Sequence, residues 1–392
     1  MVNHSKSNER VFGLDLLRAV AIALVLLSHF LLVPLRAFSR HFMGWPLTAG
    51  CFGVEFFFVL SGFLIGGILI RDFSESVTTG TLVRFWCRRW LRTLPLFYLF
   101  FAINFAIESS VDGLPTGWWR NAFFAQNFAG TAGPFFREAW SLSVEEWFYL
   151  LAPALIFASV KMGLPLKRAV LAVALGDIVC ATAWRMHVVA GGHLNWLQDV
   201  RPVVTMRLDA CMFGVFAAWW HHYAPESWNA WRQSMLGIGI LCLLGAGAMF
   251  RLLNLSASFA AGVYLFTLTS VGAMLCLPAL AALRQPRAKL ARAVTSVSRW
   301  SYAMYLVNIP IFMWLEREAG RALEDPFTAA IAAITGLALT VYASALLHYT
   351  FEMPILRWRD RRMSASPKTG AGFKRPRAEL CAPRISPSRA LL

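Results

Sequence analysis

Blocks of apolar residues alternate with shorter polar stretches along most of the chain. The blocks reach roughly 17 to 25 residues, the length that a helix rising about 1.5 Å per residue needs to cross about 30 Å of hydrocarbon. Each block therefore predicts one membrane-spanning helix. Ten spans are predicted, at residues 12–34, 51–71, 93–108, 142–160, 168–189, 203–220, 235–252, 259–281, 301–317 and 327–350.

This pattern predicts an all-α fold, a polytopic membrane helix bundle with about ten transmembrane helices. Composition supports it, because 58% of the 392 residues are hydrophobic and only 15% are charged. A soluble domain of this length could not bury so much apolar side chain. We expect residues 1–11 to be an N-terminal segment, residues 12–360 to form the membrane domain, and residues 361–392, rich in Ser, Pro, Lys and Arg, to be a disordered basic tail.

The formal net charge of +16 would suggest nucleic acid as the partner of a soluble protein. Here most Lys and Arg residues fall in every second loop between apolar blocks, so we expect contact with the lipid bilayer and no nucleic acid partner. An even number of spans places both termini on one side, which the positive-inside rule predicts to be the cytoplasm. The seven cysteines show no metal-ligand spacing, so we expect free thiols and no metal site.

The first span contains three ionisable residues, Asp15, Arg18 and His29. Ionisable side chains are costly at membrane depth, so each one is a candidate functional group. Arg18 and His29 are eleven residues apart and share one helix face, about 16 Å from each other. The imidazole could act as a base because it exchanges protons near neutral pH, although a buried histidine that hydrogen-bonds to a neighbouring helix would give the same pattern.

Further polar groups accompany the next two spans. Glu55 interrupts the apolar run GVEFFFVLSGF, whereas Ser61 and Gly62 in the same run are typical of close helix packing. Arg89 and Arg92 share a helix face before the third span. They indicate either a topology anchor or a clamp for a phosphate-bearing ligand.

The segment WSLSVEEWFY at the fourth span carries two adjacent carboxylates. Ser143 and Glu146 resemble the capping box of a helix N-terminus, which is the structural alternative to a functional role. Glu145 and Tyr149 suit acid-base chemistry or the binding of an acceptor hydroxyl. Further candidates are Arg207 and Asp209 in RLDACMFG and Glu352 in EMP.

Seven motifs follow one another along the chain: Arg18 and His29 with ten residues between them, GVEFFFVLSGF, the RxxR of Arg89 and Arg92, WSLSVEEWFY, RLDACMFG, SYAMYL, and the ExP of Glu352. In this order they resemble the acyltransferase-3 family of membrane O-acyltransferases, from about Phe12 to Arg359. The resemblance implies a membrane helix bundle that transfers an acyl group, most often acetyl, from cytoplasmic acyl-CoA to a hydroxyl of a glycan or glycolipid.

The resemblance also implies roles for individual residues. His29 would be the catalytic base or the acyl-accepting group, with Arg18 supporting it, and Glu145 is a further candidate for acid-base catalysis. Arg89 and Arg92 would bind the CoA phosphates. The other candidate substrate-binding residues are Asp15, Glu55, Tyr149, Arg207, Asp209 and Glu352. Acyl-CoA would be a donor substrate, no cofactor would be bound permanently, and the protein would lie in the bacterial inner membrane.

Two positions depart from the pattern of the family. Asn308 in SYAMYLVNIP stands where members often carry His, and Leu94 replaces the Tyr that usually precedes Pro95. Asparagine hydrogen-bonds but does not exchange a proton near neutral pH, so either position 308 is structural or acceptor handling differs. The competing interpretation of the buried ionisable groups is a proton-coupled transporter or flippase, although the chain lacks the repeated halves that many such proteins have.

The segment 109–139 is too polar to span a membrane but is rich in Trp and Phe. This composition is typical of the membrane interface. Sugar rings stack on aromatic faces, so Trp118 and Trp119 are candidate contacts for the acceptor.

Overall fold

The structure is a computed structural model that describes residues 11–32, 34–35, 44–131, 133–192 and 195–364. Every regular element in these ranges is a helix, which confirms the predicted all-α class. The long helices are α1 (Phe12–Phe30), α3 (Gly44–Glu75), α4 (Thr79–Asp112), α6 (Ala139–Lys161), α7 (Leu166–Ala190), α8 (Leu208–Tyr223), α10 (Arg232–Leu252), α11 (Phe259–Ala281), α12 (Ala288–Ala319) and α13 (Pro326–Leu347). The shorter elements are α5 (Trp118–Ala122), α9 (Pro225–Ala230), α14 (Met353–Ser364), and the single turns η2 (Trp196–Val200), η3 (Val204–Met206), η4 (Gly320–Glu324) and η5 (His348–Glu352). Nearly all of the predicted N-terminal segment and disordered tail lies outside the described residues.

Eight helices in the described ranges are long and apolar enough to cross a membrane, as a multi-pass membrane protein requires. They correspond to eight of the ten predicted spans. The two remaining predictions fall on α8, which has 16 residues, and on α12, whose 32 residues include a polar first half.

α4 is much longer than its predicted span. It begins at Thr79 instead of residue 93, and the Thr78 side chain caps its start by accepting a hydrogen bond from the Thr81 amide. Arginines interrupt the apolar pattern of this region without interrupting the helix, because they are good helix formers. Arg89 and Arg92 therefore lie on α4 itself, where helix geometry fixes their direction.

α6 also begins earlier than predicted, at Ala139. Ser143 is therefore one turn inside the helix, and the capping-box interpretation of Ser143 and Glu146 is wrong. The Ser143 hydroxyl donates to Ala139 O at 3.1 Å and accepts from Gln126 Nε2 at 2.6 Å. With the cap excluded, the two carboxylates of this segment need another explanation.

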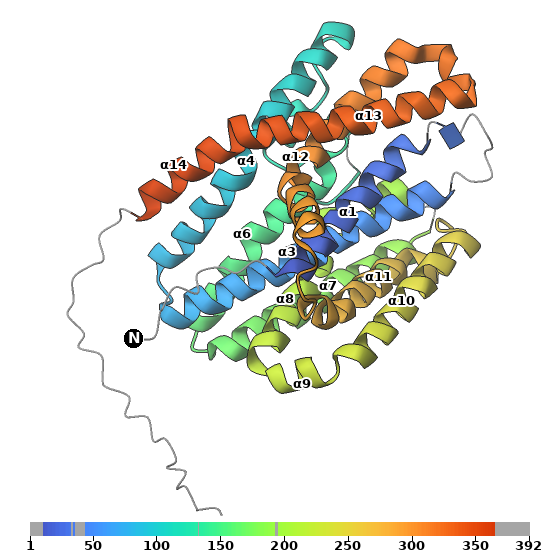
Figure 1. Ribbon diagram of the computed structural model, residues 1–392. Coiled ribbons are helices and arrows are strands. Elements are labelled where there is room, and N and C mark those ends of the chain that lie inside the picture. The colour runs from blue at the N-terminus through green and yellow to red at the C-terminus, as the bar shows by residue number, and fades with distance from the viewer. Residues whose placement is uncertain (1–10, 33, 36–43, 132, 193–194, 365–392) are drawn as a thin grey trace, which may run out of the picture.

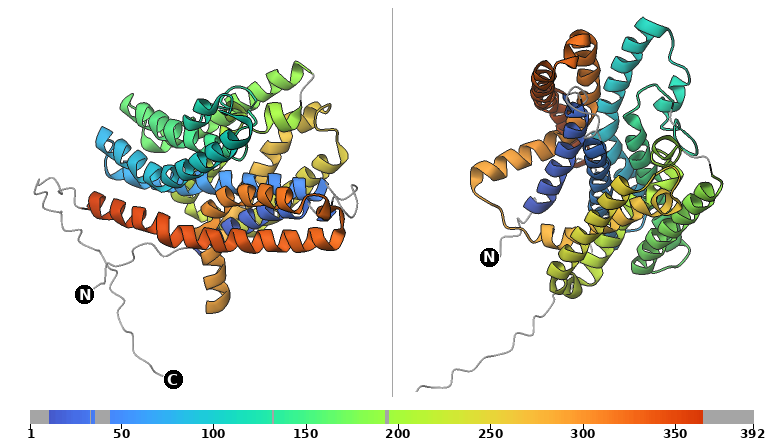
Figure 2. Two further views of the ribbon diagram at one scale, coloured as in Figure 1. Left: turned by 90° about the horizontal axis from the view of Figure 1, so that it is seen from above. Right: turned by 90° about the vertical axis from the view of Figure 1, so that its right-hand side faces the viewer.

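The core of the bundle is built on α1 and α3, which run side by side through its middle (Figure 1). α3 packs against α8, and α1 packs against α12. A Cβ added at Gly62 would lie 1.8 Å from Cys211 O of α8, which confirms that Gly62 serves close helix packing. Figure 2 shows the green and yellow helices α7 to α11 grouped on one side of this pair and the orange α12 and α13 on the other.

An aromatic segment between α4 and α6 packs on the second half of α4. The rings of Phe124 and Phe136 are buried, with centres 4.4 and 5.4 Å from that of Phe97. Both residues have positive φ, 55° and 48°, which bulky side chains rarely adopt, so tertiary contacts must hold them there. Trp119 and Phe123 remain exposed, as aromatic residues at a membrane interface do.

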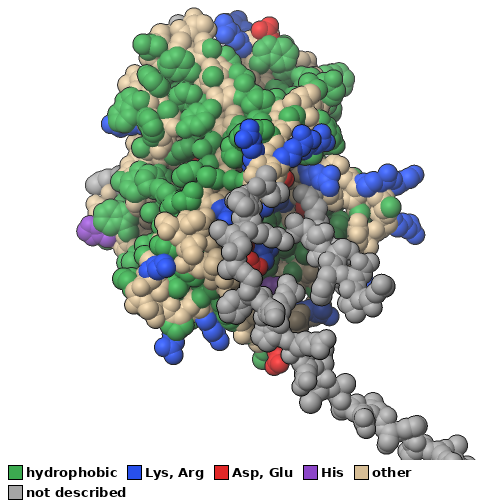
Figure 3. All heavy atoms as spheres, turned by 90° about the vertical axis from the view of Figure 1, so that its left-hand side faces the viewer, with side chains coloured by type: hydrophobic (Ala, Val, Ile, Leu, Met, Phe, Trp, Pro, Cys, Tyr) green, Lys and Arg blue, Asp and Glu red, His purple; other side chains and the backbone are tan. Residues whose placement is uncertain are grey.

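One face of the molecule is basic. Figure 3 shows the face at which α4 begins and α14 ends, where Lys and Arg side chains are numerous among hydrophobic ones and acidic side chains are few. The positive-inside rule associates such an excess with the cytoplasmic side of a membrane.

Candidate active site

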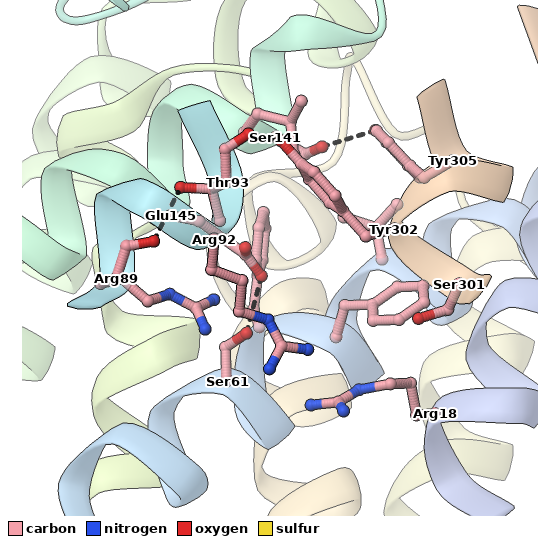
Figure 4. Close-up of a pocket in the computed structure, with 14 residues that line it drawn as sticks. Arg18, Ser61, Arg89, Arg92, Thr93, Ser141, Glu145, Ser301, Tyr302 and Tyr305 are labelled. Carbon is pink, nitrogen blue, oxygen red and sulfur yellow. Dashed lines mark hydrogen bonds between the residues drawn. The ribbon is translucent and has the colours of Figure 1, made fainter. Parts of the chain in front are cut away.

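A cavity of about 640 Å³ opens between α1, α3, α4, α6 and α12. Polar side chains from all five helices converge on it (Figure 4). The lining residues are Arg18, Val54, Phe57, Phe58, Ser61, Arg89, Arg92, Thr93, Ser141, Leu142, Glu145, Ser301, Tyr302 and Tyr305.

Four side chains form a hydrogen-bonded network at one wall of the cavity. Ser61 Oγ donates to Glu145 Oε1 and Tyr149 OH donates to Glu145 Oε2, each at 2.8 Å. Arg89 donates to Tyr149 OH, and its guanidinium carbon lies 4.0 Å from the centre of the tyrosine ring. Tyr149 thus links a cation to a carboxylate, and Arg89 is held by partners within the protein.

Arg18 and Arg92 reach the same cavity from α1 and α4 (Figure 4). In the described part of the chain, neither guanidinium forms a salt bridge with a carboxylate. Arg92 is exposed and Arg18 half-buried, and both side chains line the cavity. Their donors are therefore accessible to a ligand inside it.

The cavity carries an excess of positive charge, because three arginines and one glutamate line it. Like charges repel strongly where water is largely excluded. An anionic ligand would relieve that repulsion, and the planar guanidinium fork suits phosphate because it donates two parallel hydrogen bonds. The cavity therefore has the charge to hold a phosphate-bearing ligand.

His29 lies toward the other end of α1 and is not among the lining residues. Its Nδ1 lies 2.6 Å from Asn308 Oδ1 of α12. The Asn308 amide nitrogen donates to Met304 O and Tyr305 O, so the amide oxygen faces His29 as an acceptor. Nδ1 of a neutral imidazole then carries the proton and Nε2 keeps the lone pair of a base. Asparagine at this position orients the imidazole without competing for its proton.

A pair of hydroxyls lies where the cavity approaches His29. Tyr305 and Ser141 line the cavity and hydrogen-bond to each other through their hydroxyls (Figure 4). Tyr305 is one helical turn before Asn308 on α12, so the His29 imidazole and this end of the cavity are neighbours along that helix.

Three predicted substrate-binding residues belong to a separate, closed cluster. Arg207 pairs with Glu55, whose second oxygen accepts from Ser270 Oγ at 2.9 Å. Asp209 pairs with Arg185 at 2.6 Å. The four charged side chains are at most 2% exposed and none lines the cavity. This geometry supports a structural role, in which the cluster ties α3, α7 and α8 together.

Asp15 and Glu352, two further predicted substrate-binding residues, also contact protein groups. Asp15 accepts from Ser298 Oγ at 2.7 Å, which joins α1 to α12. Glu352 Oε2 lies 2.6 Å from His348 Nδ1 within η5, which packs against α4. Neither carboxylate lines the cavity.

Sequence reasoning missed part of the cavity wall. Ser61 was expected only to allow close packing, yet its hydroxyl bonds to a lining carboxylate. Ser141 and Tyr305 lie in the motifs WSLSVEEWFY and SYAMYL, which could have indicated them, although the residue types alone suggest no role. Conversely, Trp118 and Trp119, the candidate acceptor contacts, are not among the lining residues.

Within the described ranges, no group of three or more His, Cys, Asp or Glu side chains could hold a metal ion. The cysteines that these ranges contain are free, and Cys381 lies outside them.

The fold and the cavity define a multi-pass membrane protein with a polar, cation-rich site inside its helix bundle. The family model described as an acyltransferase domain matches residues 11–349, so the chain belongs to the acyltransferase-3 family. This confirms the resemblance that the motifs indicated.

Two relatives match part of the chain. The O-acetyltransferase OatA of Staphylococcus aureus is 32% identical over 159 residues, which cover 37% of this chain and 24% of that protein. The peptidoglycan O-acetyltransferase OatA of Listeria monocytogenes is 31% identical over 173 residues, 40% of this chain and 25% of that protein. The matches thus span about a quarter of each relative. No solved structure is significantly similar to the chain.

Proposed function

We propose that the protein is a membrane O-acyltransferase that moves an acyl group, in the first place acetyl, from cytoplasmic acyl-CoA to a hydroxyl of a glycan or glycolipid. The observation that carries this proposal is the cavity inside a bundle of the acyltransferase-3 family. Two of its arginines, Arg18 and Arg92, form no salt bridge with a carboxylate that the structure describes. The names of the relatives support acetyl as the group and a glycan as the acceptor.

The donor phosphates bind between Arg18 and Arg92. The motif predicted Arg89 and Arg92 as the clamp, but Arg89 is already held by Tyr149, so Arg18 is the more accessible partner. Arg89 acts through Tyr149 on the Glu145 carboxylate. The acyl-pantetheine arm then extends along the cavity toward Tyr305 and the His29 end.

His29 acts as the general base. Its Nε2 takes the proton of the acceptor hydroxyl while that oxygen attacks the carbonyl carbon of the thioester. The carbon–sulfur bond breaks, and the leaving CoA thiolate takes the proton from the imidazolium, which restores the base. Asn308 keeps the imidazole in the tautomer that this step requires.

The donor enters from the cytoplasm and the acceptor from the opposite side of the bacterial inner membrane. The basic face in Figure 3, which lies at the start of α4, supports this orientation with both termini cytoplasmic. A site inside the membrane would let a thioester made in the cytoplasm react with a hydroxyl acceptor on the opposite side.

The test is transfer from radiolabelled acetyl-CoA in inside-out membrane vesicles, at matched amounts of protein. His29→Ala is expected to lower the label in glycan and lipid fractions by about 100-fold or more, the usual size of a general-base effect. His187→Ala is the matched control, because His187 is exposed on α7 and stacks only on Trp184. It should transfer label at the unaltered rate.

Two results would count against the proposal. Equal label in His29→Ala and the unaltered protein would remove His29 from the mechanism. No label with any variant, together with movement of an unmodified polar substrate, would favour the transporter interpretation.

A further inference from the structure

A cation outside the donor cavity lies close to the proposed base. Arg201, between α7 and α8, places its guanidinium carbon 4.7 Å from the centre of the Trp140 ring. Trp140 directly precedes Ser141, whose hydroxyl bonds to that of Tyr305. Tyr305 lies one helical turn before Asn308, the partner of His29. Arg201 therefore belongs to the end of the site at which an acceptor hydroxyl would arrive.

The backbone that carries Arg201 is firmly anchored. Trp196, five residues earlier, is 1% exposed and its ring stacks on Phe266 with centres 4.7 Å apart. Asn127 donates to Pro202 O, directly after Arg201 in the chain. A loop held at both ends keeps the guanidinium in one place, as a binding group requires.

Arg201 has no acidic partner among the residues that the structure describes. It is half-buried, and a guanidinium partly removed from water without a counter-charge is unfavourable. The face of Trp140 offsets part of that cost through a cation–π contact. The N–H donors of Arg201 that do not face the ring remain available to an anion.

We propose that Arg201 and Trp140 form an acceptor subsite for an anionic sugar, one that carries a carboxylate or a phosphate near the hydroxyl to be acylated. Arg201 binds the anion through two parallel N–H···O bonds, and Trp140 fixes the plane of the guanidinium. The anion then anchors the sugar with its hydroxyl next to His29. The subsite rests on the proposed function for its role as acceptor site, whereas the binding itself requires no acyl transfer.

The subsite differs from the donor clamp in position and in environment. Arg18 and Arg92 line the cavity, whereas neither Arg201 nor Trp140 does. A phosphate-bearing donor and an anionic acceptor would therefore be bound at once, on either side of the Tyr305 and Ser141 hydroxyls.

The experiment measures equilibrium binding of labelled oligosaccharides to the full chain in lipid nanodiscs, with no acetyl-CoA present. The three probes are a glucose oligomer, the matching oligomer of glucuronic acid, and the glucose oligomer phosphorylated at O6. At least one anionic probe is expected to bind about tenfold or more tightly than the neutral one, the usual effect of a charge-assisted hydrogen bond. The two anionic probes distinguish carboxylate from phosphate.

The variants locate the binding. Arg201→Gln is expected to abolish the preference for anionic sugar, and Arg201→Lys to keep part of it, because lysine retains the charge but loses the planar fork. Arg92→Gln, in the donor clamp, should leave the preference intact. Arg201→Lys also serves as the deciding variant if Arg201→Gln does not fold.

Three outcomes overturn the subsite. Equal affinity for the neutral and both anionic probes removes it, and so does an unchanged preference in Arg201→Gln. Loss of the preference in Arg92→Gln would place the sugar in the donor cavity. Failure of the proposed function is distinguishable, because it would appear as absent label transfer in vesicles and leaves this binding measurement untouched.

Discussion

Two clusters of arginines lie in the same helix bundle, and they differ in whether their charges are paired. In the closed cluster, Arg185 and Arg207 each have a carboxylate partner, and the pairs are at most 2% exposed. In the cavity, Arg18 and Arg92 form no salt bridge with any described carboxylate and line an open space. The charges of the first cluster are neutralised within the protein, whereas the described residues supply no carboxylate partner to Arg18 and Arg92.

Whether a charge within the membrane is paired helps to decide whether its role is structural or functional. Membrane depth makes every ionisable residue a candidate for function, because each is costly there. By their position in the membrane alone, Glu55 and Arg207 are candidates of the same kind as Arg18 and Arg92. Their salt bridge distinguishes Glu55 and Arg207 from the other two, because a charge neutralised inside a closed core cannot contact a substrate unless that core is disrupted.

The closed cluster provides the largest expected effect. Arg207→Met leaves Glu55 buried without its partner, and breaking a buried pair in this way costs about 3–5 kcal/mol of folding free energy. We expect a large loss of folded protein, measured by size-exclusion chromatography and by thermal unfolding in detergent. The double variant Arg207→Met, Glu55→Met should recover most of the loss, because no unpaired charge remains.

Normal folding with loss of activity would show that the two clusters do not differ in function. If Arg207→Met folded as the unaltered protein and lost only acyl transfer, Arg207 would be a substrate-binding residue, as the sequence suggested. The double variant would then also be inactive despite normal folding.

Glu138 combines one property of each cluster. Its side chain is buried, as in the first cluster, and it forms no salt bridge with a described residue, as in the second. It directly precedes α6, and its Oε1 is buried without a hydrogen-bond partner. Burial raises the pKa of the Glu138 carboxyl from 4.5 to about 7. The folded chain therefore holds a proton that the unfolded chain has lost between pH 4.5 and about 7, so stability falls as pH rises through that window.

The expected loss for Glu138 is about 3 kcal/mol between pH 5 and pH 8, from a pKa shift of between two and three units. Glu138→Gln should remove this pH dependence, which thermal unfolding at the two pH values measures. Glu226→Gln on exposed α9 is the matched control and should keep it. Parallel pH curves for Glu138→Gln and the unaltered protein would show that the carboxyl is not buried as described.

The sequence predicted the helices well because the signal is local. The span at 12–34 follows from apolar residues alone, and α1 covers most of it. The start of α4 was missed because Arg89 and Arg92 interrupt the apolar run while the helix continues through them. Local composition thus predicts that a helix exists and predicts its ends less well.

Partnerships across the bundle could not be predicted from the sequence. Glu55 and Arg207 are 152 residues apart, and His29 and Asn308 are 279 apart. No local pattern encodes such a pair, because it depends on which helices pack and at what depth. The sequence indicated Arg18 and Glu145 as candidates, but that they line one cavity follows only from the fold.

The smallest expected effect lies within the cavity, where Tyr149 holds the Arg89 guanidinium and Arg92 forms no salt bridge with a described carboxylate. Arg92→Gln should raise the KM for acetyl-CoA about 10–100-fold, or about 1.4–2.8 kcal/mol, because it removes one charge-assisted contact to phosphate. It should leave kcat nearly unchanged and leave folding unimpaired, since it relieves repulsion between guanidiniums. Steady-state kinetics and thermal unfolding of the same preparations measure both.

Arg89→Gln should behave differently, because it breaks the link from Arg89 through Tyr149 to Glu145. We expect a fall in kcat larger than the change in KM, since the lost contacts position catalytic groups instead of holding the donor. Rising salt should weaken donor binding in the unaltered protein more than in Arg92→Gln, because an accessible cation is screened by salt. If both variants changed KM equally with kcat unaffected, Arg89 would be a donor ligand like Arg92, and pairing with Tyr149 would not predict which arginine is free to bind.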